Sequence, residues 1–319
     1  MYYHVNGQLV PAEEATVSVR DRGFLYGDAA FETLRAYGGE VFEWDAHRAR
    51  LERTCEALGM PDAAPDDLAL RIAEALDAND LEDAYVRASV TRGVQPGRLT
   101  PAEDVDPSVV VVVEPLPRGG LGGESVWDGP AVVQSVKTRR TAPNALPPDL
   151  KTHNYLNGIL ARLELRRASS DAYRPDEALM RDADGFVAEG ATSNLFFVDD
   201  GTLKTPAEGS ILPGVTRRVV LDLAADEVFP VEVGRYAPDD VRGADEAFLT
   251  NTTWEVRPIA SVDGIEVGAG PITRLLARLF DEHVEERCYR RESSRREPSA
   301  PDAPDADDGD DGDDGDHNP

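Results

Sequence analysis

One irregular segment near the middle of the chain does most to limit the folds that this sequence can form. Residues 115–123 read PLPRGGLGG, and this proline- and glycine-rich run interrupts the strand and helix patterns on both sides. The 319 residues are enough for two domains of roughly 100–200 residues each. We therefore expect a small N-terminal α/β domain over residues 1–114, a linker over 115–124 and a larger C-terminal domain over 125–288.

The first domain is expected to combine short strands with two helices. Alternating apolar and polar residues predict the strands, and Gly38-Gly39 is typical of a two-residue hairpin turn. Asp45 stands where a helix N-cap belongs, and helical spacing then continues as far as Gly59. The expected strands span residues 15–19, 31–37, 40–44, 85–91 and 108–114, and the second helix spans residues 65–78.

The second domain repeats this mixture, so the predicted fold class is α+β. The predicted strands are 125–137, interrupted by Asp-Gly-Pro, then 178–181 and 193–199, with a turn at 182–185. The predicted helices are 154–168, one that begins just after Gly214, and 271–288. Apolar residues become scarce from Tyr289 onward, and residues 289–319 are expected to form a disordered acidic tail.

Charge and composition exclude several classes of partner. The net charge is −28, and so negative a field repels nucleic-acid phosphates and anionic lipid headgroups. No apolar run reaches the roughly 18 residues of a membrane span, and the first residues lack a signal-peptide pattern. The two cysteines, Cys55 and Cys288, are too few for a disulfide framework or a cysteine metal cluster. We expect a cytoplasmic protein that binds neither nucleic acid nor membrane.

The acidity has two explanations. A high content of Asp and Glu with almost no lysine keeps a protein hydrated in concentrated salt, where screening limits self-repulsion, so a halophilic source is one interpretation. The other is that the tail distorts the count. Residues 301–319 hold nine aspartates and no Lys or Arg, and subtracting them from −28 still leaves −19 on the 300 preceding residues. The body of the protein is itself acidic.

Lysine is the residue type that points to chemistry. The sequence has no phosphate-binding P-loop, no G-x-S-x-G nucleophile and no H-E-x-x-H, and its five histidines are scattered, so no metal site is expected. Only three of the 33 basic residues are lysines. Arginine replaces a surface lysine well but cannot form a Schiff base. Lys137 and Lys204 have surface-like surroundings, whereas Lys151 precedes a predicted helix within apolar sequence, which makes it a candidate nucleophile.

The rest of the second domain fits chemistry with pyridoxal 5'-phosphate. That cofactor needs a lysine for its aldehyde, an acidic partner for its pyridine nitrogen and donors for its phosphate. Glu189 stands among small and apolar residues, which indicates a buried, partnered carboxylate. Gly214, Val215 and Thr216 begin a predicted helix, where backbone N–H groups and a hydroxyl are available to a phosphate.

These segments carry a family resemblance over about residues 2–285. In order, they read DRGFLYGD (21–28), FETLR (31–35), KTHNY (151–155), EGATSN (189–194), LPGVTR (212–217) and TNTTWE (250–255). This series resembles the class IV (fold type IV) pyridoxal-phosphate-dependent enzymes, which include branched-chain aminotransferases, D-amino-acid aminotransferases and 4-amino-4-deoxychorismate lyases. The resemblance implies a two-domain, D-amino-acid-aminotransferase-like fold, with the cofactor bound by the C-terminal domain.

Roles for individual residues follow from the matching motifs. Lys151 is implied as the catalytic Schiff-base lysine and proton shuttle, and Glu189 as the partner of the pyridine nitrogen. The other implied cofactor contacts are Arg50, Tyr155, Val215, Thr216 and Thr252. The implied substrate contacts are Phe31, Arg87, Arg98 and Thr253. The resemblance also implies a homodimer that acts on an amino-acid-like substrate and borrows a loop from the neighbouring subunit.

The substrate remains open between related activities. The Y-x-R pattern at Arg87 resembles branched-chain aminotransferases, whereas FETLR, KTHNYL and the G-R-Y ending at Tyr236 resemble the lyases. Thr100 stands where D-amino-acid aminotransferases have a histidine, which counts against that activity. We favour 4-amino-4-deoxychorismate lyase, which releases pyruvate to give 4-aminobenzoate, with branched-chain aminotransferase as a close alternative. A non-catalytic binding protein is a remote third possibility, since Lys151 and Glu189 are both present.

Overall fold

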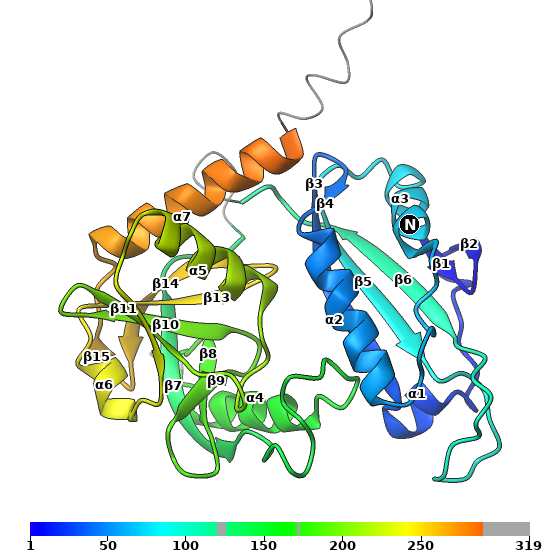
Figure 1. The fold of residues 1–319 in the computed structure, drawn as a ribbon, viewed down its shortest axis with the longest axis horizontal. Coiled ribbons are helices and arrows are strands. Elements are labelled where there is room, and N and C mark those ends of the chain that lie inside the picture. Colours follow the sequence, from blue (N-terminus) through cyan, green and yellow to red (C-terminus); the bar gives the residue numbers. More distant parts are fainter. Residues whose placement is uncertain (120–125, 171–172, 290–319) are drawn as a thin grey trace, which may run out of the picture.

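The structure is a computed structural model that describes residues 1–119, 126–170 and 173–289. Figure 1 shows two sheets with helices packed on them, side by side along the longest axis of the molecule. This mixture of elements confirms the α+β class. The expected tail from residue 290 onward lies outside the described residues.

The N-terminal sheet has six strands among the described residues, in the order β2-β1-β6-β5-β3-β4. All of its pairings are antiparallel. The strands are β1 (Tyr2–Val5), β2 (Gln8–Pro11), β3 (Ala29–Tyr37), β4 (Glu40–Val41), β5 (Ala84–Thr91) and β6 (Val109–Pro115). The predicted hairpin at Gly38-Gly39 is confirmed, because both glycines have positive φ and join β3 to β4.

Two helices cover one face of this sheet. They are α2 (Trp44–Ala57) and α3 (Leu68–Asp77), and the short α1 (Arg22–Tyr26) precedes β3. Alternate residues of β5, such as Val86 and Val90, are fully buried against Leu51 and Ile72 of these helices. The strand alternation therefore leaves the other face of β3 and β5, with Phe31 and Arg87, turned away from the helices.

The C-terminal sheet is mixed, and the described residues form nine strands of it. Their order is β12-β11-β10-β13-β14-β7-β8-β9, and β15 pairs with β14. The first strands are β7 (Ala131–Arg139), β8 (Glu177–Arg181), β9 (Val187–Gly190), β10 (Asn194–Asp199) and β11 (Thr202–Pro206). The others are β12 (Val231–Gly234), β13 (Glu246–Asn251), β14 (Glu255–Val262) and β15 (Ile265–Glu266).

Helices pack against this sheet, and residues of the N-terminal hairpin join its core. The helices are α4 (Leu156–Ala168), α5 (Val215–Asp226), α6 (Pro238–Arg242) and α7 (Pro271–Val284). Figure 1 shows α5 and α7 above the strands and α4 below them. Tyr37 and Phe42 belong to the same core cluster as Phe196 and Phe280, and the Phe42 and Phe280 rings lie 5.6 Å apart. This shared core fixes the two sheets relative to each other.

Some predicted elements are wrong or shorter than expected. Residues 15–18 have no regular structure, and Val17 and Val19 are exposed, because the alternating segment finds no neighbouring strand to pair with. Glu43, with φ of 53°, is the N-cap of α2, so the helix begins at Trp44 and shortens the preceding strand. Asp45 lies in the first helical turn instead.

The boundaries near the linker and the tail also differ from the predictions. Pro115 ends β6, residues 116–119 have no regular structure, and residues 120–125 lie outside the described residues. β7 begins only after Asp-Gly-Pro, at Ala131. Tyr289, expected in the tail, closes a π-helical turn after α7 and donates a hydrogen bond to Asp83 Oδ1 at 2.5 Å. The predicted domain boundaries themselves remain predictions.

Candidate active site

A cavity opens where the middle of α2 and the Lys151 segment meet the C-terminal sheet. Its lining includes Arg50, Arg140, Lys151 and Tyr155. The remaining lining residues come from three short segments, 189–194, 212–216 and 250–252. These segments hold most of the residues that the sequence motifs single out, so the fold brings together parts of the chain that are about two hundred positions apart.

The Lys151 segment is held by backbone contacts to the N-terminal sheet. Phe31 N donates to Lys151 O at 3.0 Å, and His153 N donates to Ala29 O at 2.9 Å. Lys151 N donates to Thr54 Oγ1 at 3.3 Å, which ties the same residue to α2. The lysine therefore lies at the seam between the two sheets, and its position depends on both of them.

The Lys151 side chain is surrounded by aromatic rings rather than by acids. It is 9% exposed, and its Nζ lies 4.6 Å from the centre of the Phe31 ring. Tyr155 OH is 3.4 Å from Nζ. In the described part of the chain, no carboxylate lies within ion-pair distance of Nζ. The amine therefore faces the cavity with a hydroxyl as its hydrogen-bond partner.

Glu189, on β9, is a buried carboxylate with three donors. Arg140 Nη2 lies 2.8 Å from Oε1, and Asn194 Nδ2 donates to Oε2 at 3.0 Å. Leu212 N donates to both oxygens at 3.1 Å. Burial raises the pKa of Glu189 to about 7, although Arg140 and the Leu212 N–H act to lower it. Such a group can share a proton with a basic ligand atom near neutral pH.

Another part of the cavity lining is suited to a phosphate. Val215 and Thr216 begin α5, where backbone N–H groups of the first turn have no partner within the helix. Arg50 lines the same region, and its Nη1 donates to Pro213 O at 2.9 Å. Gly214 is required at the helix start, because a Cβ atom there would lie 2.0 Å from Asn194 Oδ1.

An unsatisfied hydroxyl supports the presence of a ligand at this site. Thr250 Oγ1 is buried and lacks a hydrogen-bond partner among the described residues, although Thr250 lines the cavity. Thr252, in the turn that follows β13, also lines the cavity. A lysine, a buried carboxylate and the start of a helix that line one cavity match the donor set that pyridoxal 5'-phosphate requires. The residues present therefore fit the cofactor that the motifs imply.

Phe31, one of the predicted substrate contacts, lies beside the lysine, and a second, Arg87, packs on the Phe31 ring, although neither lines the cavity itself. The Phe31 ring makes edge contacts with Tyr155 at 5.3 Å and with His153 at 5.6 Å between ring centres. The Arg87 guanidinium carbon lies 3.8 Å from the centre of the same Phe31 ring. The Phe31 ring thus contacts both the Lys151 amine and the Arg87 guanidinium.

The other two predicted substrate contacts lie elsewhere. Thr253 does not line the cavity; its hydroxyl bonds to Asn251 Oδ1 at 3.1 Å, and its carbonyl accepts from Arg35. Arg98 is exposed on the loop after β5 and also lies outside the cavity lining. The fold of one chain therefore does not bring Arg98 to Lys151.

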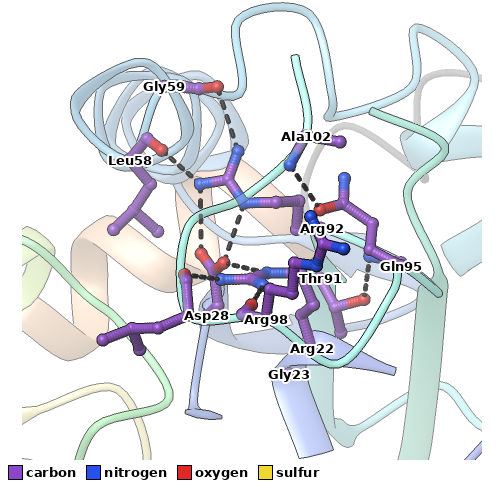
Figure 2. Close-up of polar contacts among 12 residues, drawn as sticks. Arg22, Gly23, Asp28, Leu58, Gly59, Thr91, Arg92, Gln95, Arg98 and Ala102 are labelled. Atoms are coloured by element: carbon purple, nitrogen blue, oxygen red, sulfur yellow. Dashed lines mark hydrogen bonds and ion pairs between the residues drawn. The ribbon is translucent and has the colours of Figure 1, made fainter. Parts of the chain in front are cut away.

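A buried charge cluster holds the loop that carries Arg98. Figure 2 shows the guanidinium groups of Arg22 and Arg92 converging on Asp28. Each Nε lies 2.8 Å from Asp28 Oδ2. Arg22 then donates to the Arg98 carbonyl at 2.6 Å, and Arg92 to the Leu58 carbonyl at 2.5 Å. The cluster links the N-terminal motif, the loop and the end of α2.

Sequence reasoning missed several residues of the site. Arg140 carries no local signal, because its partner Glu189 is distant in the sequence. Asn194 and Thr250 stand inside the recognised motifs but were given no role. Glu32 and His47, which contact Arg50, also have no implied role; Glu32 stands inside FETLR, whereas His47 stands outside the quoted motifs. Among the described residues there is no cluster of three potential metal ligands and no helix long and apolar enough to cross a membrane.

Comparisons with known proteins agree on one family. The sequence profile described as "Amino-transferase class IV" matches residues 29–262. A "Putative branched-chain-amino-acid aminotransferase" of Methanocaldococcus jannaschii is 37% identical over 287 residues, which cover 88% of this chain and 96% of the relative.

Two solved structures resemble the chain over most of its length. The branched-chain aminotransferase of Thermoproteus uzoniensis with norvaline has a TM-score of 0.81 and 31% identity, covering 91% of this chain and 96% of its own. The branched-chain amino acid aminotransferase of Thermobaculum terrenum in its PLP-form (holo-form) has a TM-score of 0.76 and 29% identity, covering 91% of this chain and 95% of its own.

Proposed function

Because the chain belongs to the class IV aminotransferase family, we propose that this pyridoxal-phosphate-dependent enzyme is a branched-chain amino-acid aminotransferase. The contacts of the Phe31 ring with both Lys151 and Arg87 carry the proposal. An apolar ring beside the reactive amine suits an aliphatic side chain, and a cation on the same ring suits a carboxylate.

The relatives' names support this choice over the lyase that the motifs favour. The M. jannaschii relative is named a branched-chain aminotransferase, as are further curated relatives at 33–34% identity. The sequence alone favours 4-amino-4-deoxychorismate lyase through FETLR and KTHNYL. Both activities use a lysine at the same position, so Lys151 does not distinguish them.

Different residues of this chain have different roles in the proposed reaction. When bound, the cofactor supplies an aldehyde for the amino group and an electron-withdrawing ring. Lys151 would hold that aldehyde, and its Nζ would take up the proton from the substrate Cα. Tyr155 OH orients Nζ through its 3.4 Å contact. Glu189 holds a proton on the ring nitrogen, and Arg50, Val215, Thr216 and Thr252 bind the phosphate.

The test uses the scarcity of lysine in this chain. Borohydride treatment of the cofactor-loaded protein is expected to fix the cofactor on Lys151, and peptide mass spectrometry separates it from Lys137 and Lys204. We expect Lys151→Ala to lower activity at least about a thousandfold. The matched control is Lys204→Arg, because Lys204 is a surface lysine paired with Asp199 at 2.7 Å, and we expect it to retain activity.

Assays with two substrates then separate the activities. We expect transfer of the amino group from leucine to 2-oxoglutarate. Release of pyruvate and 4-aminobenzoate from aminodeoxychorismate, without transamination, would instead support the lyase. A protein that takes up no pyridoxal phosphate, even in high salt, would contradict the enzyme function altogether.

A homodimer is the second part of the proposal. We define an apolar patch by six exposed side chains: Phe24, Leu25 and Tyr26 of α1 and Leu156, Ile159 and Leu160 of α4. The two helices are neighbours, because a Cβ at Gly27, directly after α1, would lie 3.6 Å from Asn154 N, just before α4. An uncharged surface of this kind on a chain of net charge −28 suits a second copy as its partner. The cytoplasmic location and the adaptation to salt rest on composition and stay predictions.

A further inference from the structure

Three buried ionisable side chains form a cluster behind the phosphate end of the cavity. Glu32 on β3 is 1% exposed, and His47 and Arg50 on α2 are 2% and 4% exposed. Arg50 donates to Glu32 through Nε at 2.8 Å and through Nη2 at 2.7 Å. His47 Nδ1 lies 2.8 Å from Glu32 Oε2. Burial of so many polar groups is costly unless each is paired, and here each has a partner.

Glu32 and His47 contact Arg50 from the side away from the cavity. Arg50 lines the cavity, whereas Glu32 and His47 are not part of its lining. Within the described chain, Arg50 donates through Nε and one N–H of Nη2 to Glu32 and through one N–H of Nη1 to Pro213 O, and its Nη2 lies 3.5 Å from His47 Nδ1. A guanidinium has five N–H groups, so one on each Nη remains for a ligand. The two bonds to Glu32 thus fix which edge of Arg50 is presented.

The protonation states agree with this geometry. Burial raises the pKa of Glu32, but Arg50 and His47 more than offset it, and the pKa falls to about 2. Burial lowers the pKa of His47, so its ring is neutral near pH 7. An ionised carboxylate can only accept hydrogen bonds, so the Nδ1 atom of His47 must carry the proton. The Glu32 carboxylate therefore accepts hydrogen bonds from both Arg50 and His47.

We propose that Glu32 and His47 are positioning residues that aim Arg50 at the phosphate group of the cofactor. The inference rests on the proposed cofactor site. A long arginine side chain loses conformational entropy when it binds a ligand. A guanidinium that is already held in its binding orientation loses less. The charge of Glu32 acts in the opposite direction, since it repels the phosphate. We expect the gain from orienting Arg50 to exceed this repulsion, because the two hydrogen bonds to Glu32 leave only the Nη1–Nη2 edge of the guanidinium for the phosphate.

A simpler alternative is that the cluster only holds α2 against β3. The two roles predict different affinities for pyridoxal, which lacks the phosphate group. If Glu32 acts through Arg50, its loss weakens binding of pyridoxal 5'-phosphate and leaves pyridoxal unaffected. If Glu32 only supports the fold, both ligands lose affinity together, because both depend on the position of Lys151.

The experiment titrates the full-length protein, freed of cofactor, with each ligand and follows the visible absorbance. We expect Glu32→Gln to weaken pyridoxal 5'-phosphate binding about tenfold, as for one lost charge-assisted hydrogen bond, and to leave pyridoxal binding unchanged. Arg50→Gln is expected to show the same selectivity, and the double variant no further loss, because both changes remove one interaction. The matched control is Glu52→Gln, an exposed residue of α2 paired with Arg48.

Other outcomes overturn the inference in distinguishable ways. Equal loss for both ligands, or an unchanged affinity for pyridoxal 5'-phosphate, contradicts it while leaving the proposed function intact. A wild-type protein that binds neither compound contradicts the proposed function and the inference with it. If Glu32→Gln does not fold, His47→Asn removes one of the three contacts to Glu32, and the same selective loss is expected.

Discussion

Among single residues, Glu189 couples the cofactor site to pH. Burial raises the pKa of its carboxyl to about 7, from a usual value of 4.5. Between these two values the folded chain keeps the proton that the unfolded chain has lost. The contribution of Glu189 to the free energy of unfolding of the cofactor-free protein should therefore fall as pH rises from about 4.5 to 7, by at most about 1 kcal/mol per unit. The lowered pKa values of His4, His47 and His153 act in the opposite direction over part of this range, so the difference between wild type and Glu189→Gln isolates the Glu189 contribution. Urea unfolding at several pH values measures this slope.

The variant Glu189→Gln removes this titrating group, so the slope of its free energy of unfolding against pH should be more positive than that of the wild type. Its absolute stability is expected to be lower, because one amide oxygen cannot satisfy Arg140, Asn194 and the Leu212 N–H together. The control is Glu52→Gln, whose carboxylate is exposed. An unchanged slope in Glu189→Gln would mean that another group carries the pH dependence.

Among the elements, the start of α5 depends on close contact between two segments. Gly214 has φ of −68° and ψ of 139°, which alanine adopts without strain. The cost of Gly214→Ala therefore comes from the clash with Asn194 Oδ1, 2.0 Å from the added Cβ. We expect a loss of about 1–3 kcal/mol in the free energy of unfolding and weaker cofactor binding.

A double variant tests the cause of that loss. In an Asn194→Ala background, Gly214→Ala should cost much less, because the clashing oxygen is gone. Denaturant unfolding of the four proteins gives the interaction energy. Equal costs in both backgrounds would place the cause in the helix start itself rather than in Asn194.

Elements set by local chemistry were predictable from the sequence. The Gly38-Gly39 turn and the alternation in β5 specify their structure within a few residues. Residues 15–18 show the limit, since they alternate like a strand but lack a neighbour to pair with. The residues of the site also fall into a group that the sequence predicts and a group that it does not. Lys151, Glu189 and Arg50 belong to short motifs, whereas the ion pair between Arg140 and Glu189 arises only when distant segments meet.

At the scale of the whole molecule, the net charge of −28 should make stability depend on salt. The screening length falls from about 10 Å at 0.1 M salt to about 3 Å at 1 M, which weakens repulsion between surface carboxylates. We expect the melting temperature of the full chain to rise when KCl increases from 0.1 to 2 M. Sucrose at matched osmolality is the control, because it changes hydration without screening. An equal rise in sucrose would contradict an electrostatic cause.

The apolar patch on α1 and α4 leads to a prediction about assembly. Phe24 is 66% exposed and Leu156 is 60% exposed, so replacing either with aspartate should leave the fold of one chain intact. If the patch joins two copies, Phe24→Asp and Leu156→Asp should each shift the mass measured by light scattering from twice 34.6 kDa towards 34.6 kDa. Leu70→Asp is the matched control, because Leu70 is 58% exposed on α3, at the opposite end of the N-terminal sheet from α1 (Figure 1). A dimer that survives both patch variants would place the contact between subunits elsewhere.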